Sequence, residues 1–156
     1  MQFNRNVGTT LIANILIGLP ASCKSTFCSE YLSDNNVVIS LDILKSRVRE
    51  KKRVEECISQ HWPFVVDNTN ITKSDRLRYI DAAKCNNYLV HGYYFSSTLK
   101  DALRRNRLRV GAGKIPDAAI FAIAKRLELP AMAEGFDQLF SVQLDGMGGF
   151  IVKKMI

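Results

Sequence analysis

The nine residues from Gly18 to Thr26 constrain this chain more than any other stretch; they read Gly-Leu-Pro-Ala-Ser-Cys-Lys-Ser-Thr. They follow the apolar run 11–17 and precede a segment with the apolar spacing of a helix. A glycine, four free positions, Gly-Lys and then Ser or Thr is typical of a loop whose backbone N–H groups surround phosphate oxygens. A strand before the loop and a helix after it are the context that this motif requires, because the helix N-terminus adds free N–H groups. The stretch therefore predicts a phosphate-binding loop.

The motif assigns roles within this loop. Lys24 is expected to reach the outer phosphates of a nucleotide, and the Ser25 hydroxyl to ligate Mg²⁺. The residues expected to bind the nucleotide are Gly18, Ala21, Ser22, Cys23, Lys24, Ser25 and Thr26.

Cys23 stands where the motif has its second glycine. Glycine is favoured there because it accepts a positive φ and lets the backbone approach the ligand closely. A thiol beside a helix N-terminus and a lysine is also in the setting that lowers a cysteine pKa and promotes oxidation. Two interpretations stay open: a loop that binds phosphate in spite of the cysteine, and a loop that survives only as a scaffold.

Composition limits the class of protein. A chain of 156 residues that is 47% hydrophobic and 24% charged predicts one compact domain over 1–156. The apolar runs are shorter than the ~20 residues of a membrane span, and the N-terminus lacks a signal-peptide layout, so we expect a cytoplasmic monomer. Four scattered cysteines form neither a zinc pattern nor a disulfide framework. The net charge of +7 favours anionic partners.

Strands and helices are expected to alternate along the chain. After the strand at 11–17, we expect strands at 37–40, 63–66, 88–95, 140–144 and 149–152, and helices at 24–32, 43–59, 72–84, 99–108 and 117–127. This order predicts an α/β fold with a parallel sheet covered by helices on both faces. The carboxyl ends of such strands form the ligand-binding edge. The loop 110–116, which contains two glycines, suits a movable lid.

Two carboxylates follow expected strands directly. Asp42 is a candidate base for an attacking hydroxyl group, and its alternative role is to cap the helix that follows. Asp67 stands where a Walker B carboxylate would hold Mg²⁺ through water. The segment 67–70, Asp-Asn-Thr-Asn, also consists of residues that strongly favour turns. Asn68, Thr69 and Asn70 therefore either orient a substrate or form hydrogen bonds to backbone groups.

The basic segment before the glycine-containing loop has two interpretations. Arg105 and Arg109 are expected on adjacent turns of one helix, and therefore on one face. A solvated basic face is the usual meaning of such a run. Their place just before a flexible loop favours lid arginines that close on the phosphates of ATP.

Taken together, these motifs resemble the 5′-hydroxyl polynucleotide kinases, a P-loop kinase domain found in phage and in eukaryotic end-healing enzymes. The resemblance rests on the segment 18–26, Asp42, the segment 65–70, Arg76, Arg78, the run from Arg105 to Arg109 followed by Ile115-Pro116, Pro130 and the segment 134–137. It covers nearly the whole chain.

The resemblance implies transfer of the γ-phosphate of ATP, with Mg²⁺, to the 5′-hydroxyl end of RNA or DNA. It implies that Asp42 accepts the proton of that hydroxyl group and that Lys24 and Arg109, supported by Arg105, stabilise the transferred phosphate. Acceptor binding is expected at Lys45, Asp67, Asn68, Thr69, Asn70, Arg76 and Arg78, and Mg²⁺ binding at Ser25 and Asp67. Lys45 stands where family members often have Arg.

Two other functions remain compatible with these residues. Small P-loop kinases that phosphorylate an alcohol group of a sugar, antibiotic or nucleoside share most of these parts. Cys23 is also compatible with a degenerate module that binds nucleotide or RNA without catalysis.

Overall fold

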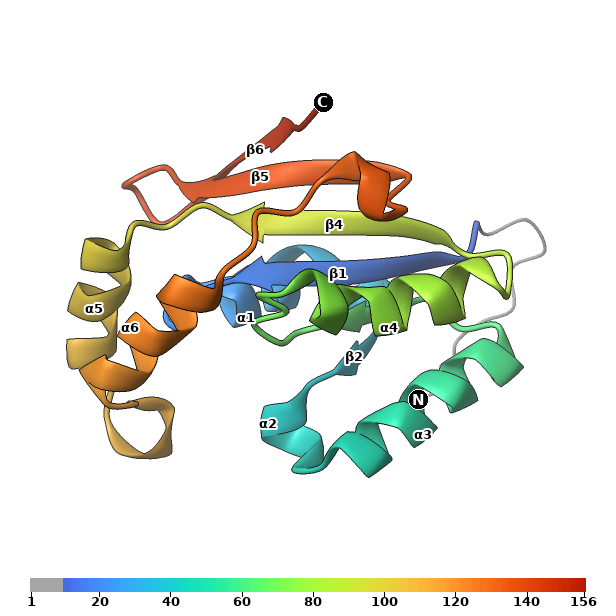
Figure 1. Ribbon diagram of the computed structural model, residues 1–156, viewed down its shortest axis with the longest axis horizontal. Coiled ribbons are helices and arrows are strands. Elements are labelled where there is room, and N and C mark those ends of the chain that lie inside the picture. Colours follow the sequence, from blue (N-terminus) through green and yellow to red (C-terminus); the bar gives the residue numbers. More distant parts are fainter. Residues whose placement is uncertain (1–9) are drawn as a thin grey trace.

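The computed structural model describes residues 10–156 and has a six-stranded sheet with the order β2-β3-β1-β4-β5-β6 (Figure 1). The strands are β1 (Ile12–Gly18), β2 (Val37–Ile39), β3 (Phe64–Val66), β4 (Leu89–Phe95), β5 (Gln138–Leu144) and β6 (Phe150–Lys154). The first five strands are parallel to their neighbours, and β6 pairs antiparallel with β5. This confirms the predicted parallel sheet and its final pair of strands.

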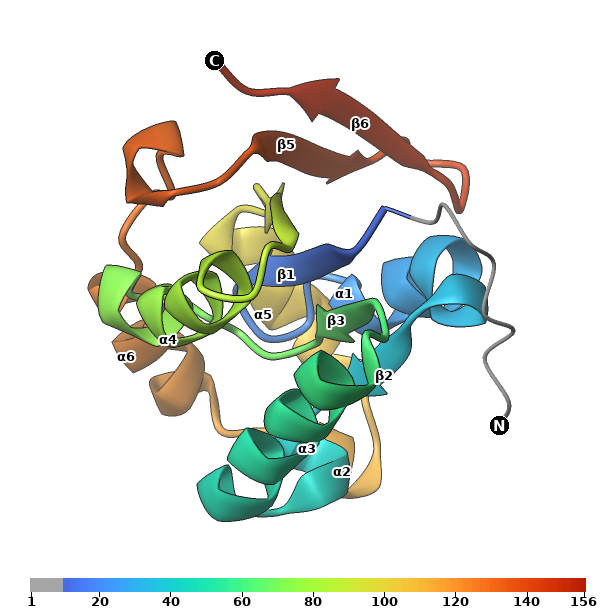
Figure 2. The same cartoon turned by 90° about the vertical axis from the view of Figure 1, so that its right-hand side faces the viewer.

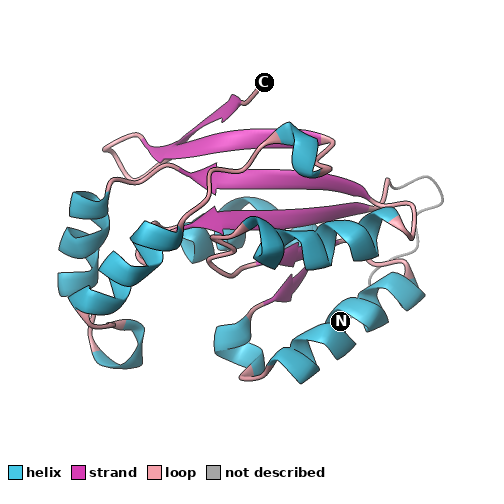
Figure 3. Cartoon of the chain, viewed as in Figure 1, coloured by secondary structure: helices cyan, strands magenta, loops and turns pink. Residues whose placement is uncertain are grey.

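Helices connect the strands (Figure 3). They are α1 (Lys24–Phe27), α2 (Leu41–Leu44), α3 (Arg47–Gln60), α4 (Lys73–Lys84), α5 (Leu99–Arg107) and α6 (Asp117–Arg126). A π-helical turn η1 (Cys28–Leu32) and the short 3₁₀ turns η2 (Ser33–Asn35), η3 (Gly111–Gly113) and η4 (Met132–Glu134) complete the set. The helix expected over 24–32 is therefore α1 followed by the wider turn η1.

The two faces of β1 belong to two different cores, since successive side chains of a strand point to opposite faces. Ile15 and Ile17 pack with residues of α3 and α4, whereas Leu16 packs with Phe27 of α1 and Cys28 of η1. Figure 2 accordingly shows α4 and the α1–η1 segment on opposite sides of β1. Because β1 is buried on both faces, its residues 12–17 are apolar except for the buried Asn14, as expected for a central parallel strand.

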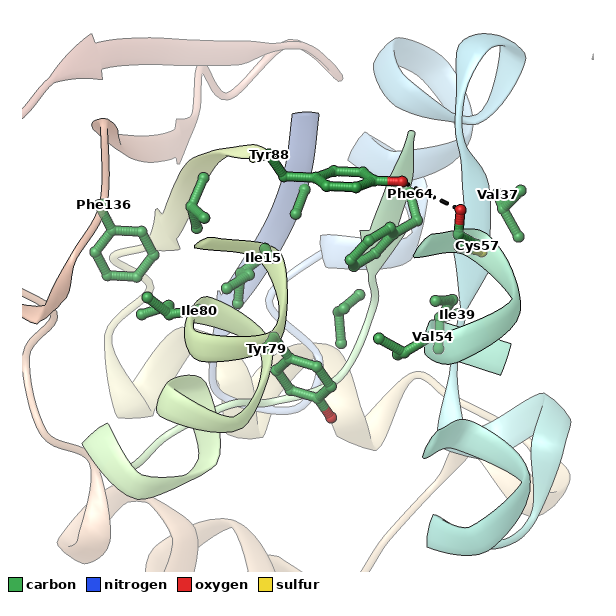
Figure 4. Close-up of a cluster of buried hydrophobic side chains, with 14 of the residues drawn as sticks. Ile15, Val37, Ile39, Val54, Cys57, Phe64, Tyr79, Ile80, Tyr88 and Phe136 are labelled. Atoms are coloured by element: carbon green, nitrogen blue, oxygen red, sulfur yellow. Dashed lines mark hydrogen bonds between the residues drawn. The ribbon is translucent and has the colours of Figure 1, made fainter. Parts of the chain in front are cut away.

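The larger core lies under α3 and α4 (Figure 4). Phe64 and Tyr88 fill its centre, and the Tyr88 hydroxyl donates to the backbone oxygens of Cys57 (3.1 Å) and Trp62 (2.9 Å). Burying aromatic and branched side chains of this kind contributes about 1.5–3 kcal/mol each. This core fixes α3 and α4 against the sheet that carries the cleft.

Local sequence explains where α4 begins. The Thr72 hydroxyl accepts from the Asp75 backbone N–H (3.1 Å), and the Asp75 carboxylate accepts from the Thr72 backbone N–H (3.2 Å). This reciprocal pair is a capping box, which satisfies two backbone donors that a helix end leaves free. The predicted helix start at Thr72 is confirmed.

The single helix expected over 43–59 is instead two helices. Lys45 ends α2 in the left-handed conformation (φ 63°), and Ser46 then caps α3 by accepting from the Arg49 backbone N–H (3.2 Å). A serine that caps a helix stabilises it by about 1 kcal/mol, which favours a new start here. Asp42 therefore lies in the first turn of α2, whose N-cap is Ser40, so the alternative that Asp42 is itself the cap is wrong.

The helices α5 and α6 pack on each other beside the sheet's carboxyl edge. Asn106 is buried between them; its amide donates to the Ile115 backbone oxygen (2.6 Å) and accepts from the Ile115 N–H (3.1 Å). These two bonds close the loop 108–114, whose residues are exposed. The predicted loop is therefore held at its base and exposed over its length.

Candidate active site

The phosphate-binding loop adopts its expected backbone in spite of the missing glycine. Cys23 has φ 67° and ψ 25°, and Ala21 has φ 58°, both in the left-handed region. A non-glycine residue there costs roughly 1–2 kcal/mol. The strain expected at Cys23 is therefore present, and the loop forms with it.

Gly18 is needed where the loop leaves β1. A Cβ atom on Gly18 would approach the Phe95 Cβ at 3.0 Å and its backbone oxygen at 3.1 Å, and φ is +156°. The Gly18 N–H donates to the Thr69 backbone oxygen at 2.9 Å. This bond ties the phosphate-binding loop to the segment that follows β3.

Lys24 is buried beneath the loop, with 8% of its surface exposed. Its Nζ donates to the backbone oxygens of Leu19 (2.6 Å) and Gly18 (3.0 Å) and to the Ser22 Oγ (3.2 Å). Burial lowers the pKa of Lys24 to about 8, and the charge of Asp67 offsets this only in part. The ammonium group is thus charged at neutral pH and held at the loop where phosphates are expected.

Ser25 and Asp67 meet across the cleft. The Ser25 Oγ donates to the Asp67 Oδ2 at 2.7 Å, and burial raises the pKa of the Asp67 carboxyl, against the effects of Ser25 and Lys24. Mg²⁺ prefers oxygen ligands and commonly takes one or two from protein and the rest from water and phosphates. In the described residues no group of three or more His, Cys, Asp or Glu side chains can hold a metal. The Ser25–Asp67 pair fits a Mg²⁺ ion that is shared with a nucleotide.

A cavity of about 460 Å³ lies at the carboxyl edge of the sheet. Loop residues 20–25 line it together with Asp67, Asn68 and Thr69, which follow β3. The remaining lining residues come from the segment of α2 and α3 (Leu41, Asp42, Lys45 and Arg47) and from the segment after α5 (Arg109, Ala112, Gly113 and Ile115). This volume is within the usual range of small-molecule sites. The cavity therefore brings together the loop, both carboxylates and the lid arginine.

Asp42 stands on the exposed side of this cavity. Within residues 10–156 no hydrogen bond or ion pair engages its carboxylate, and its charge acts on both Lys24 and Asp67. A carboxylate that is free of partners and faces a phosphate site is suited to accept a proton.

The segment 67–70 has two different functions in the structure. Asn68 and Thr69 line the cavity, whereas Asn70 is 3% exposed and donates to the Leu16 backbone oxygen (2.8 Å). The Asn68 Oδ1 accepts from the Leu41 N–H at 2.9 Å. Asn68 therefore orients the segment before Asp42, and Asn70 anchors the loop to β1.

The prediction that Arg76 binds the acceptor is wrong, because its side chain is 0% exposed. It forms a two-bond ion pair with Glu134 (2.7 and 3.1 Å), and its Nη1 donates to the backbone oxygens of Asn70, Ile71 and Glu128. Arg78 lies outside the residues that line the cavity and pairs with Asp75 at 3.6 Å. Only the resemblance assigns these two arginines to the acceptor, and neither lies among the residues that line the cavity.

The two lid arginines do not share a helical face, because α5 ends at Arg107. The Arg105 Nε donates to the Ala21 backbone oxygen, while its Nη2 is buried without a hydrogen-bond partner in the described part of the chain. Arg109 lies beyond the helix, lines the cavity and donates to the Gly113 backbone oxygen at 3.0 Å. Arg105 supports the phosphate-binding loop, and Arg109 faces the cleft.

Thr26 is exposed and is not among the lining residues of the cavity.

Sequence reasoning missed Arg47, which lines the cavity. The expected helix over 43–59 is continuous and gives Arg47 no role, whereas in the structure Lys45 ends α2 and Arg47 begins α3. The available signal was Ser46, a strong capping residue directly before Arg47. Over residues 10–156, none of the helices has the length and apolar character needed to cross a bilayer.

The sequence of this chain is similar to those of two polynucleotide phosphatase/kinases. A protein of Acanthamoeba polyphaga mimivirus, provisionally named bifunctional polynucleotide phosphatase/kinase, is 31% identical over 135 residues, which are 82% of this chain and 32% of that protein. The bifunctional polynucleotide phosphatase/kinase of Schizosaccharomyces pombe is 27% identical over 132 residues, with the same coverage of 82% and 32%. The chain thus spans about a third of the length of the curated relatives it matches.

Solved structures show the same fold at low identity. A gluconokinase from Sinorhizobium meliloti 1021 has a TM-score of 0.60 at 15% identity and covers 85% of this chain and 82% of its own. Kti12 of Chaetomium thermophilum, in complex with ADP-AlF3, has a TM-score of 0.59 at 18% identity and covers 85% and 89%. Residues 14–130 match the model of the family described as an AAA domain. Since that match covers most of the chain and the fold is that of the P-loop kinases, the protein belongs to the AAA domain family.

Proposed function

We propose that residues 1–156 form one kinase domain that transfers the γ-phosphoryl group of ATP to the 5′-hydroxyl end of RNA or DNA, as a monomer in the cytoplasm. Two observations support the acceptor class. The curated relatives are named polynucleotide phosphatase/kinases, and this chain aligns with about a third of each. The chain is also basic, with a net charge of +7, which favours a polyanionic acceptor.

The observation that carries the proposal is the cavity that Asp42 shares with the phosphate-binding loop, since the Asp42 carboxylate has no partner among residues 10–156. Phosphoryl transfer needs positioning and charge stabilisation more than covalent chemistry, and it needs a group that takes the proton of the attacking hydroxyl. Lys24, Arg109 and Asp42 line one cavity. Lys24 and Arg109 are candidates for charge stabilisation, and Asp42 is the candidate for the proton acceptor.

On the nucleotide side, the loop N–H groups and Lys24 would hold the β- and γ-phosphates. Lys24 now contacts loop carbonyls, so binding would exchange these contacts for phosphate oxygens, which favour the charged ammonium group. Ser25 and Asp67 would hold the Mg²⁺ ion, which when bound neutralises charge on the phosphate oxygens. Arg109 would approach the same oxygens from the lid.

On the acceptor side, the terminal 5′-oxygen would attack the γ-phosphorus in line with the leaving oxygen of ADP. The new O–P bond forms as the γ-phosphorus to β,γ-bridging-oxygen bond breaks, and the hydroxyl proton passes to Asp42. Asp42 then returns the proton to water. Its exposure in the open cavity allows that exchange.

The test is transfer of label from γ-labelled ATP, with Mg²⁺, to an oligonucleotide that ends in a 5′-hydroxyl group. The same oligonucleotide already phosphorylated at that end is the matched control. We expect label on the hydroxyl-ended strand alone. Transfer to a sugar or nucleoside but not to the oligonucleotide would instead identify a small-molecule kinase. Absence of transfer to any of these acceptors would support the degenerate module.

A further inference from the structure

Arg47, the first residue of α3, lines the cavity on the same side as Asp42 and Lys45. Its side chain is about half exposed, at 49%. Only Nη1 is engaged, donating to the Glu50 Oε1 (2.9 Å) and the Tyr79 hydroxyl (3.0 Å). In the described part of the chain, the Nε and Nη2 donors of Arg47 have no protein partner. Half of the guanidinium group is therefore held by the protein, and half is available to a ligand.

The anchor that holds Arg47 is a buried carboxylate. Glu50 is 2% exposed; its carboxylate accepts from Arg47, from the Tyr79 hydroxyl (2.7 Å) and from the Asn68 amide (2.7 Å). A buried charge is costly unless it is paired and hydrogen bonded, so these contacts depend on one another. Figure 4 shows the Tyr79 hydroxyl directed away from the apolar cluster that its ring joins. The guanidinium group is thus fixed in one orientation before any ligand binds.

The same carboxylate also fixes the segment that carries the candidate base. Asn68 donates to Glu50 with its amide nitrogen and accepts from the Leu41 N–H with its oxygen. Leu41 directly precedes Asp42. A ligand oxygen bound by Arg47 would therefore be held at a defined position relative to Asp42.

We propose that Arg47 binds a phosphodiester oxygen of the acceptor strand near its 5′ end, with Glu50, Tyr79 and Asn68 as positioning residues. This inference rests on the proposed function and names a residue for its acceptor side. A guanidinium fork matches two phosphate oxygens, whereas the ammonium group of neighbouring Lys45 is a point charge. Glu50 balances the charge of Arg47, so the long-range attraction of Arg47 for the strand is small. Arg47 would therefore bind the strand through its directed N–H donors.

The experiment compares two hydroxyl-ended oligonucleotides that differ at the linkages nearest the 5′ end, which are phosphodiesters in one and uncharged methylphosphonates in the other. Binding is measured by fluorescence anisotropy, and label transfer is measured separately. The unaltered protein should bind the phosphodiester strand roughly tenfold or more tightly, as expected for a hydrogen bond to a charged group. Arg47→Gln should lose this preference and keep its affinity for ATP.

Arg49→Gln is the matched control, because Arg49 is an exposed arginine of the same helix that does not line the cavity. It should keep the preference. Tyr79→Phe, which removes one contact of Arg47 and leaves its charge, should reduce the preference in part without changing the affinity for ATP.

The outcomes separate the two proposals. If Arg47→Gln keeps the phosphodiester preference, or if Lys45→Gln alone removes it, the assignment to Arg47 is overturned. If binding depends on Arg47 as expected but no label reaches the hydroxyl end, Arg47 remains a strand-binding residue and the proposed kinase function fails.

Discussion

The two sides of the cavity are built differently. On the nucleotide side, the polar groups are bonded to one another: Lys24 contacts three loop oxygens, and Ser25 donates to Asp67. On the side proposed to bind the acceptor, Asp42 and Lys45 are exposed on or next to the four-residue helix α2. A site that is bonded internally is preformed, whereas exposed groups on short elements adjust when a ligand binds. The nucleotide side is thus the rigid half, and the proposed acceptor side is the adaptable half except for Arg47, which Glu50 and Tyr79 hold.

The sharpest way to separate the halves is Asp42→Asn. Loss of the proton acceptor should lower kcat for label transfer roughly 10²–10⁴-fold. ATP affinity should stay nearly unchanged, because Asp42 has no hydrogen bond within the described residues to the loop. The control is Asp81→Asn, because Asp81 is an exposed residue of α4 that does not line the cavity. This substitution should change neither kcat nor ATP affinity. An equal loss of ATP binding would show that the halves are not separable.

A second prediction tests the support that both halves share. Arg76 holds the backbone oxygens of Asn70 and Ile71, directly after the segment that lines the cavity, and is itself paired with buried Glu134. Glu134→Ala leaves this buried charge without its carboxylate and should lower the free energy of unfolding by about 3–5 kcal/mol. Urea denaturation measures it, and Glu128→Ala, an exposed carboxylate nearby, should cost much less. A loss below 1 kcal/mol would contradict the anchoring role.

A third prediction concerns pH on the rigid half. The pKa of Lys24 is lowered to about 8 by burial, so its ammonium group loses its proton as pH rises through about 8 in the free protein. Affinity for ATP should be constant below that pH and should fall by up to tenfold per pH unit above it, since the charged form binds phosphate. Titration calorimetry from pH 6.5 to 9.5 checks this.

Lys24→Arg should flatten that profile, because arginine keeps its charge throughout the range. The linked effect on stability has the opposite sign. The folded state holds the pKa of Lys24 below its ordinary value of 10.5, so the free energy of unfolding of the nucleotide-free protein should rise between about pH 8 and 10.5 from this group.

The smallest expected effect is at Cys23. Cys23→Gly removes left-handed strain but frees the unfolded chain, so it should raise the free energy of unfolding by no more than about 1 kcal/mol. ATP affinity should change a few-fold at most, because the loop already forms with the cysteine. Ala21→Gly, at a φ of 58°, is the companion variant. A large gain in ATP binding for Cys23→Gly alone would show that the thiol, and not the backbone, impairs the loop.

Strong local signals account for what was predicted well. Both faces of β1 are buried, so its sequence is an apolar run that predicts a central strand. The capping residue Thr72 predicts the start of α4. The cavity residues 21–25 are expected from a motif whose spacing is set by backbone geometry, and Asp42 and Asp67 are expected from their places directly after strands. Such features are local, so neighbouring residues are enough to specify them.

Other features depended on contacts between distant segments. Arg76 and Arg47 are both arginines near motif residues, yet one pairs with Glu134 inside the protein and the other faces the cleft. No local rule separates them, since their environment is created by elements 58 residues apart in one case and by a helix break in the other.

The sequence by itself therefore determined the parallel α/β sheet, the phosphate-binding loop and the edge at which its carboxylates gather, because periodicity, capping and motif spacing are properties of short segments. Only the tertiary structure decided which polar side chains face the cavity. It buried Arg76 and Asn70, placed Arg105 against the loop and placed Arg47 in the lining of the same cavity as Asp42. The physical reason is that the orientation and the burial cost of a polar group depend on partners that folding brings from elsewhere in the chain.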